Sequence, residues 1–212
     1  MAFVHDATRG YFRCRRCMLI YVAPEGRPSR NAEKARYDLH QNDPADEHYR
    51  RFLGPLADAL LHATPQGAAG LDFGCGPGPA LAAMLSEAGR SVTLYDPFYA
   101  PDESVWSRTY DFIAAAEVLE HLHCPRTELD RLFAVLRPGG VLGVMTAFAP
   151  ATAAEFRKWH YVRDPTHVCF YSREVLEYIA SDRQATVLFP SANVALLTRS
   201  EEQTPSGAAS RL

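Results

Sequence analysis

The chain has 212 residues, of which 47 % are hydrophobic and 22 % are charged, a balance that suits a globular protein with a sizeable core. The formal net charge is −3 and there is no run of Lys or Arg, which argues against a nucleic-acid partner. No apolar segment reaches the roughly 20 residues that span a bilayer, and the N-terminus lacks the apolar stretch of a signal peptide, so we expect no membrane association.

The N-terminal part of the chain divides into two predicted units. Residues 1–30 are predicted to be irregular, with one short apolar run at residues 18–22 and a turn-rich stretch after it. Residues 31–66 are predicted to be helical, in two pieces that break around residues 42–44, and the second piece has an apolar face. We therefore expect a small N-terminal extension and a helical unit ahead of the main domain.

Residues 67–198 alternate between predicted strands and helices, the order typical of an α/β domain with a doubly wound, mostly parallel sheet. One helix is expected from about residue 79 to residue 88. Residues 199–212 are polar and contain Gly and Ser, which predicts a disordered tail. The first predicted strand of this domain begins at residue 71, and further strands are predicted at residues 91–96, 110–116, 141–145, 185–189 and 194–198.

The strand that begins at residue 71 runs directly into a loop with glycine at every second position: Gly74, Gly76 and Gly78. Without side chains, such a loop lets a ligand lie against backbone N–H groups, and the next helix points its electropositive end at the same place. A dinucleotide fingerprint needs G-x-G-x-x-G, and Pro79 stands where its third glycine belongs.

Asp96 ends the next predicted strand, where a carboxylate can accept hydrogen bonds from both hydroxyls of a ribose. The alternative is that Asp96 and Pro97 only start a turn, which both residue types favour. After the glycine loop, the ribose interpretation is preferred, because a nucleoside would place its ribose beside that loop.

The pattern D-x-G-x-G-x-G at residues 72–78, the acid at Asp96, the strand and acidic motif at residues 110–121 and the helix stop and strand at residues 136–145 resemble, in the same order, the motifs of class I S-adenosylmethionine-dependent methyltransferases. The resemblance covers about residues 68–197 and implies a Rossmann-like sheet of the seven-stranded type. In that sheet the last two strands form a hairpin and the last strand is antiparallel.

The same resemblance implies S-adenosylmethionine as the cofactor and a small-molecule acceptor as the partner, and the odd number of five cysteines adds a reducing, cytoplasmic location. Residues 31–66 would then form a lid over the cofactor. The implied cofactor-binding residues are Asp72, Gly74, Gly76, Gly78 and Asp96, with Pro97 or Phe98 against the adenine and with Tyr37 and His40 at the methionine end or the acceptor.

Glu117, Glu120 and His121 are spaced so that they share one face of a helix, and they follow the carboxyl end of a parallel strand. Two carboxylates and an imidazole on one turn favour a bound divalent cation. The E-x-x-E-H pattern resembles the metal motif of ubiquinone-pathway O-methyltransferases, and a later histidine, His167, resembles the pattern of small-RNA 3′-end methyltransferases. This resemblance implies that Glu117, Glu120, His121 and His167 hold Mg²⁺, Mn²⁺, Fe²⁺ or Zn²⁺.

Two other interpretations of the acidic motif remain open. Acids are common in the first turn of a helix because they interact with its dipole, and Glu117 can instead face the cofactor. If the metal is present, it lowers the pKa of an acceptor hydroxyl and orients it, which predicts an O-methyltransferase. His123 and His160 are candidates for the proton acceptor, and the alternative for both is an ordinary surface histidine or one that supports the metal ligands.

Three other functions compete with methyl transfer to a small molecule. An RNA 3′-terminal 2′-O-methyltransferase would share the metal ligands, but the negative net charge and the lack of a basic, aromatic surface disfavour it. A nicotinamide-dependent oxidoreductase is disfavoured by Pro79. A non-catalytic scaffold is disfavoured by the intact glycine loop and Asp96.

Cys14 and Cys17 form a C-x-x-C pattern ahead of an apolar run, which resembles one knuckle of a zinc ribbon within residues 1–30. Related methyltransferases carry a second such pair upstream, whereas only His5 precedes Cys14 here. Zinc would need His5 with a water, or a second subunit, to complete four ligands. The alternatives are a ribbon that no longer binds zinc and a true start of the chain upstream of Met1.

Overall fold

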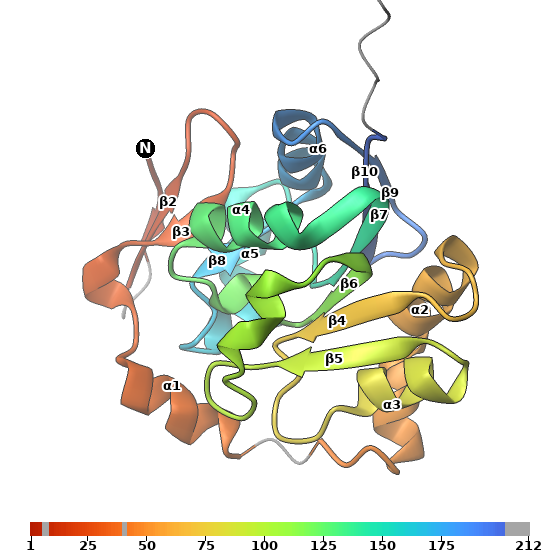
Figure 1. The fold of residues 1–212 in the computed structure, drawn as a ribbon. Helices are drawn as coiled ribbons and strands as arrows, with labels where there is room; N and C mark the ends of the chain where they lie inside the picture. Colours follow the sequence, from red (N-terminus) through yellow and green to blue (C-terminus); the bar gives the residue numbers. More distant parts are fainter. Residues whose placement is uncertain (6–8, 40–41, 202–212) are drawn as a thin grey trace, which may run out of the picture.

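The computed structural model describes residues 1–5, 9–39 and 42–201, which form a six-stranded main sheet with helices on both faces and a smaller four-stranded sheet beside it (Figure 1). The main sheet has the order β5-β4-β6-β7-β10-β9; its first four strands are parallel, β10 runs antiparallel to them, and β9 pairs antiparallel with β10 and so runs in the direction of the first four. Its strands are β4 (Ala69–Phe73), β5 (Ser91–Tyr95), β6 (Tyr110–Ala116), β7 (Leu136–Met145), β9 (Ala185–Leu188) and β10 (Val194–Arg199).

The prediction of a doubly wound sheet whose last strand is antiparallel is confirmed, and the hairpin of β9 and β10 pairs as expected. The described part of the chain has six strands in this sheet rather than seven. Between β5 and β6 it forms a short 3₁₀ helix, Glu103–Ser107. The predicted helix stop is confirmed, because α4 ends at Val135 with Leu136 as its C-cap, but the strand after it begins at Leu136 rather than at residue 141.

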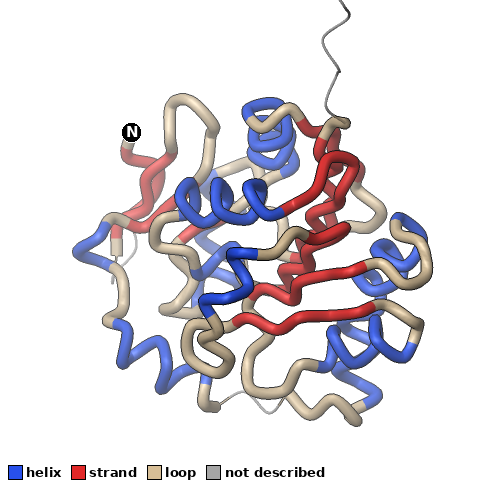
Figure 2. The backbone as a smooth tube through the Cα atoms, viewed as in Figure 1, coloured by secondary structure: helices blue, strands red, loops and turns tan. Residues whose placement is uncertain are grey.

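Helices cover both faces of the main sheet, as the tube in Figure 2 shows. Alternate residues of β6 point to opposite faces: Phe112 and Ala114 pack in one core cluster with α2 and α3, and Ile113 and Ala115 pack in the other with α4 and α6. All four are buried and apolar, as expected for a parallel strand covered on both sides. The helices are α1 (Arg30–Tyr37), α2 (Glu47–Ala63), α3 (Ala80–Glu87), α4 (Pro125–Val135), α5 (Ala153–Lys158) and α6 (Arg173–Asp182).

The two predicted helical pieces are α1 and α2, and Asn42, which lies between them, packs against the glycine loop. Ser29 caps α1 and Asp46 caps α2 by accepting hydrogen bonds from backbone N–H groups. Glycine is required at position 78 because a Cβ there would lie 1.6 Å from the carbonyl oxygen of Asn42. His40, which was predicted to contact the cofactor, lies outside the described residues.

The N-terminal extension is more regular than predicted, because it contributes three strands to an antiparallel sheet with the order β1-β2-β3-β8. Alternate apolar side chains of β2 and β3, including Tyr11 and Val22, are buried. Strands this short give little periodicity in the sequence, and β8 comes from far along the chain. The strands are β1 (Ala2–His5), β2 (Gly10–Arg13), β3 (Ile20–Val22) and β8 (Cys169–Phe170).

The C-x-x-C turn joins β2 to β3. The N–H of Arg16 donates to Sγ of Cys14 at 3.4 Å, and Met18 has a φ of 62°. Among the described residues no third His, Cys, Asp or Glu joins Cys14 and Cys17 in a potential metal group, so zinc binding stays a prediction. Residues 202–212 of the predicted tail lie outside the described residues. Among the described residues, no helix is long and apolar enough to cross a membrane.

Candidate active site

A cavity of about 990 Å³ opens at the carboxyl ends of β4, β5 and β6, the edge at which open α/β sheets bind ligands. The glycine loop (residues 74–78) and the loops after β5 and β6 form one side of it. Residues of α1 and α2, together with Asn42, Asp164 and His167, also line it. Its volume is at the upper end of the range of about 300–1,000 Å³ for small-molecule sites, which is room for a nucleoside cofactor and an acceptor.

The glycine loop adopts backbone angles that other residues avoid. Gly74 and Gly76 have φ values of 79° and 63°, and both line the cavity. A Cβ on Gly74 would lie 2.5 Å from the side chain of Val118. Gly78 does not line the cavity; it makes room for the connection between α1 and α2 instead.

Asp96 lines the cavity although it is only 7 % exposed. One carboxylate oxygen accepts a hydrogen bond from the N–H of Gly76 at 3.1 Å, and the other accepts from the N–H groups of Phe98 and Tyr99 at 2.8 and 3.1 Å. Asp96 therefore starts the turn after β5, which the sequence analysis gave as the alternative to a ribose-binding role. It also ties that turn to the glycine loop and presents its carboxylate at the cavity.

Pro97, Phe98 and Tyr37 line the cavity next to Asp96, as their predicted roles require. The ring of Phe98 packs edge-to-face with Tyr37, with centroids 5.8 Å apart, and the guanidinium of Arg30 lies 4.6 Å from the centroid of the Phe98 ring. Helix α1 thus contacts the loop after β5 directly, which closes this side of the cavity.

Asp72 is 3 % exposed and does not line the cavity, although it was predicted among the cofactor-binding residues. Burial raises the pKa of its carboxyl group to about 7, and the charge of Asp96 adds to the shift. We therefore expect Asp72, which lies buried in β4 directly before the glycine loop, to stabilise that loop rather than to contact the cofactor.

The raised pKa of Asp72 predicts a pH-dependent stability. The pKa of Asp72 is about 7 in the folded protein and near 4 in the unfolded chain, so protonation favours the folded state. As pH rises from 4 to above 7 this advantage is lost, and the free energy of unfolding falls by up to about 4 kcal/mol. Asp72→Asn should remove this loss, as measured by urea unfolding at pH 5 and pH 9. The exposed Asp58→Asn is the control, and equal pH dependence in wild type and Asp72→Asn would contradict the prediction.

Glu120, His121 and His167, here called the Glu120 group, place their ligand atoms within 4.8 Å of one another. No other group of three potential metal ligands occurs among the described residues. Glu120 is fully buried, and its Oε2 has no hydrogen-bond partner. An orphaned buried carboxylate oxygen beside two imidazoles is the arrangement that a cation would satisfy.

The backbone sets the tautomers of both histidines. Nδ1 of His121 lies 3.1 Å from the carbonyl oxygen of Thr166, and Nδ1 of His167 lies 2.8 Å from that of Tyr161. A carbonyl can only accept, so each Nδ1 carries a proton, and in the neutral ring Nε2 then carries the lone pair. Metal-binding imidazoles are oriented in this way.

The prediction that Glu117, Glu120 and His121 share one face of an α-helix was wrong. Glu117 has a φ of 53°, its N–H donates to the carbonyl of Met145 at 2.8 Å, and only Leu119–His121 forms a short 3₁₀ helix. Glu117 therefore lies outside the Glu120 group and lines the cavity instead.

Tyr161 links the two glutamates. Its hydroxyl donates to Glu117 Oε2 at 3.0 Å and also contacts Glu120 Oε1, although one proton can serve only one acceptor at a time. Burial raises the pKa of Glu120 well above its usual value, and the charge of Glu117 adds to this. Burial also lowers the pKa of His167, which keeps that imidazole neutral. A bound cation would reverse the shift at Glu120.

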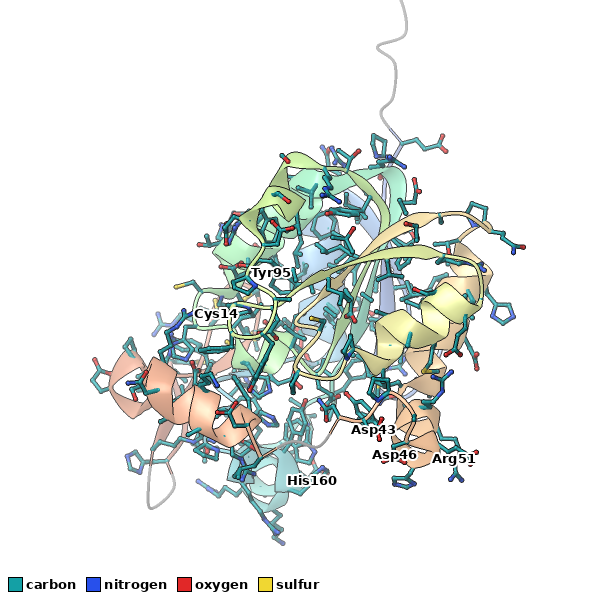
Figure 3. The ribbon with its side chains drawn as sticks, turned by 60° about the horizontal axis from the view of Figure 1, so that its bottom comes forward. Cys14, Asp43, Asp46, Arg51, Tyr95 and His160 are labelled. Atoms are coloured by element: carbon teal, nitrogen blue, oxygen red, sulfur yellow. The ribbon has the colours of Figure 1, made fainter. Side chains whose placement is uncertain are left out.

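The two candidate proton acceptors lie in different places. His123 lines the cavity, and its Nε2 is 2.7 Å from the carboxylate of Glu33 on α1, a residue that is 8 % exposed. His160 is exposed at the start of a short 3₁₀ helix and does not line the cavity (Figure 3). The structure brings His123 to the site and leaves His160 on the surface.

Glu33, Asn42 and Asp164 are among the residues that line the cavity but were not predicted from the sequence. Glu33 precedes Tyr37 by four residues, so both lie on the same face of α1, and this spacing was the available signal. Nothing near Asp164 in the sequence indicates that it reaches the cavity. Its position depends on a long-range contact, the ion pair with Arg36 of α1 at 3.0 Å.

Comparison with known proteins identifies the main domain. The model of a family described as a methyltransferase domain matches residues 45–188. No curated protein matches the chain. The similar solved structures share at most 18 % identity in the three cases below, so they bear on the fold alone.

An O-methyltransferase family protein from Burkholderia thailandensis shares 14 % identity with a TM-score of 0.53; the match covers 81 % of this chain but only 64 % of that protein. A 1,6-didemethyltoxoflavin-N1-methyltransferase from the same organism, solved with its acceptor and S-adenosylhomocysteine, shares 18 % identity with a TM-score of 0.52 over 95 % of this chain and 99 % of that one. A SAM-dependent methyltransferase from Methanosarcina mazei shares 17 % identity with a TM-score of 0.50, over 68 % and 98 % of the two chains.

Proposed function

The chain belongs to the methyltransferase domain family and is an S-adenosylmethionine-dependent methyltransferase, and from this premise we propose that it methylates an oxygen of a small molecule with the help of a divalent metal. The observation that carries the proposal is the Glu120 group, in which Glu120 has an orphaned buried oxygen while His121 and His167 line the same cavity as the glycine loop. Family membership sets aside the nicotinamide-dependent and non-catalytic alternatives.

On the cofactor side, the proposal assigns Gly74 and Gly76 to the close approach of the methionine part and Asp96 to the ribose. Phe98 and Pro97 would contact the adenine, because they follow Asp96 along the same wall of the cavity. The bound cofactor supplies an activated methyl group on a sulfonium. The chain's part is to hold the acceptor oxygen in line with that methyl group and to keep water away.

On the acceptor side, the Glu120 group would hold the metal through one carboxylate and two imidazoles. This donor set suits Mn²⁺, Fe²⁺ or Zn²⁺ better than Mg²⁺, which prefers oxygen ligands and keeps most of its waters. The metal would lower the pKa of an acceptor hydroxyl and fix its direction. Glu117 lines the cavity beside the group and is available as a further ligand or as a contact for the cofactor.

The remaining residues of the site handle protons. Tyr161 keeps its proton, because burial and the two nearby glutamates raise its pKa, and it donates to one of those carboxylates. His123 is the proposed proton acceptor, and Glu33 orients it through the bond to Nε2. Both residues lie on the same cavity as the glycine loop and His121.

The test is methyl transfer from labelled S-adenosylmethionine to a panel of acceptors, with Mn²⁺ or with EDTA. We expect transfer to catechols and vicinal diols that needs the metal, and little transfer to an amine, a thiol or a simple phenol. EDTA-insensitive transfer would contradict the role of the metal. Preference for an amine would contradict O-methylation, and the Burkholderia neighbour, named as an N1-methyltransferase, makes that acceptor a necessary comparison. A short RNA with a 3′-terminal diol tests the nucleic-acid alternative.

A further inference from the structure

We propose that Arg9, which lies in the N-terminal extension before the matched residues 45–188, is a positioning residue for the Glu120 group. It fixes the loop of residues 161–168, here called the histidine loop, and through that loop it orients both imidazoles. The inference rests on the proposed metal site. If it is correct, the N-terminal extension helps to position the metal ligands of the methyltransferase domain.

The side chain of Arg9 is buried, at 8 % exposure, and uses all five of its N–H donors. Four of them meet carbonyl oxygens of the histidine loop, about 155 residues away in the chain. The acceptors are Tyr11 Oη for Nε at 2.9 Å, the carbonyls of Pro165 and His167 for Nη1 at 2.9 and 3.0 Å, and the carbonyls of Val162 and Asp164 for Nη2, both at 2.8 Å.

Two other carbonyls of the histidine loop bind the imidazoles. The carbonyl of Tyr161 accepts from Nδ1 of His167, and that of Thr166 accepts from Nδ1 of His121. The loop thus divides its carbonyls between Arg9 and the two histidines. Any shift of the loop past Arg9 would move the carbonyls that set both tautomers, and with them the direction of each Nε2.

The far end of the histidine loop joins the third member of the group. The N–H of Val168 donates to the carbonyl of Glu120 at 2.8 Å, and the carbonyl of Val168 accepts from the N–H of Val22 in β3 at 2.9 Å. The N-terminal sheet therefore holds this loop at two places, through Arg9 and through the edge of β3. Of these two attachments, the one through Arg9 includes the carbonyl of His167 itself.

Arginine suits this position because its planar fork directs donors at several carbonyls at once. A lysine ammonium has three donors at one point and cannot reach the carbonyls of Val162 and Pro165 with the same geometry. Glutamine has two donors and no charge. Both replacements therefore leave buried carbonyls of the histidine loop without their partner.

The experiment compares Arg9→Gln and Arg9→Lys with Arg13→Gln in the full-length protein. Arg13 is the last residue of β2, four positions after Arg9, and its guanidinium lies 3.9 Å from the centroid of the Phe3 ring, but no described hydrogen bond joins it to the histidine loop. Mn²⁺ affinity is measured by electron paramagnetic resonance, S-adenosylhomocysteine affinity by calorimetry, and the mobility of residues 160–170 by hydrogen exchange.

In both Arg9 variants we expect Mn²⁺ affinity to fall at least about tenfold, S-adenosylhomocysteine affinity to stay within about twofold, and exchange to speed up in the histidine loop. Arg13→Gln should resemble wild type in all three. Arg9→Lys keeps the buried charge and decides the matter if Arg9→Gln does not fold.

Unchanged Mn²⁺ affinity in the Arg9 variants would overturn the proposal, as would a parallel loss of both affinities, which a general loss of structure would produce. If the wild type itself binds no Mn²⁺, the proposed metal site fails. Hydrogen exchange then decides about Arg9: faster exchange confined to the histidine loop supports its positioning of the loop, and unchanged exchange overturns it.

Discussion

Asp96→Ala is expected to weaken the binding of S-adenosylhomocysteine by at least about 100-fold, or about 2.7 kcal/mol, in calorimetric titration. The substitution removes the carboxylate assigned to the ribose. It also deprives three backbone N–H groups, those of Gly76, Phe98 and Tyr99, of their acceptor. Hydrogen bonds to a charged group contribute about 1.5–3 kcal/mol each, so the glycine loop and the turn after β5 would both lose their common anchor.

Asp102→Ala is the matched control for Asp96→Ala. Asp102 also accepts a backbone N–H at the start of a short helix, that of Ser104 at 2.9 Å, but it is exposed and does not line the cavity. We expect no change in affinity for this variant. A lower unfolding free energy of Asp96→Ala with unchanged S-adenosylhomocysteine affinity would mean that Asp96 only starts the turn, and the ribose assignment would be wrong.

Glu120→Gln is expected to reduce Mn²⁺ affinity by at least about 100-fold and to leave S-adenosylhomocysteine affinity unchanged. Without metal the variant should be as stable as wild type or more stable by about 1 kcal/mol, because it replaces a fully buried carboxyl group by a neutral group of the same shape. Mn²⁺ should therefore raise the melting temperature of the wild type and not that of the variant.

Glu128→Gln serves as the control for Glu120→Gln, since Glu128 lines the same cavity but pairs with Arg131 at 3.4 Å and lies outside the Glu120 group. Its Mn²⁺ affinity should equal that of the wild type. Equal Mn²⁺ affinity in wild type and Glu120→Gln would remove Glu120 from the site. Glu117→Gln then tests the fourth predicted ligand: a loss of Mn²⁺ affinity makes Glu117 a ligand, and a loss of S-adenosylhomocysteine affinity places it at the cofactor.

The fold was predictable because its signals are local and follow one another in chain order. The apolar run of β6, the glycine loop after β4 and the acid after β5 each occupy fewer than eight consecutive residues, and their sequence along the chain is that of a doubly wound sheet. The N-terminal sheet escaped prediction because β3 pairs with β8, and two residues of β8 carry no period of their own.

The site divides in the same way. Asp96, Gly74, Gly76, Glu120 and His121 follow directly from strands whose carboxyl ends meet at one edge of the sheet, so their convergence could be expected from the sequence. Helical spacing misplaced Glu117, because the backbone turns into a left-handed conformation at that residue before any helix begins. Its position depends on the bond of its N–H to Met145 in the neighbouring strand.

By itself, the sequence determined the class of fold, the cofactor and the residue types from which a metal site can be built. The family resemblance named His167 as a ligand, but only the tertiary structure places it beside Glu120 and His121. The tertiary structure alone also decided that Gly78 makes room for Asn42 and that Arg9 holds the loop that carries His167. These contacts join residues that are 36 to 158 positions apart in the chain. Local spacing contains no information about such pairs, because packing and hydrogen bonding of the whole fold bring them together.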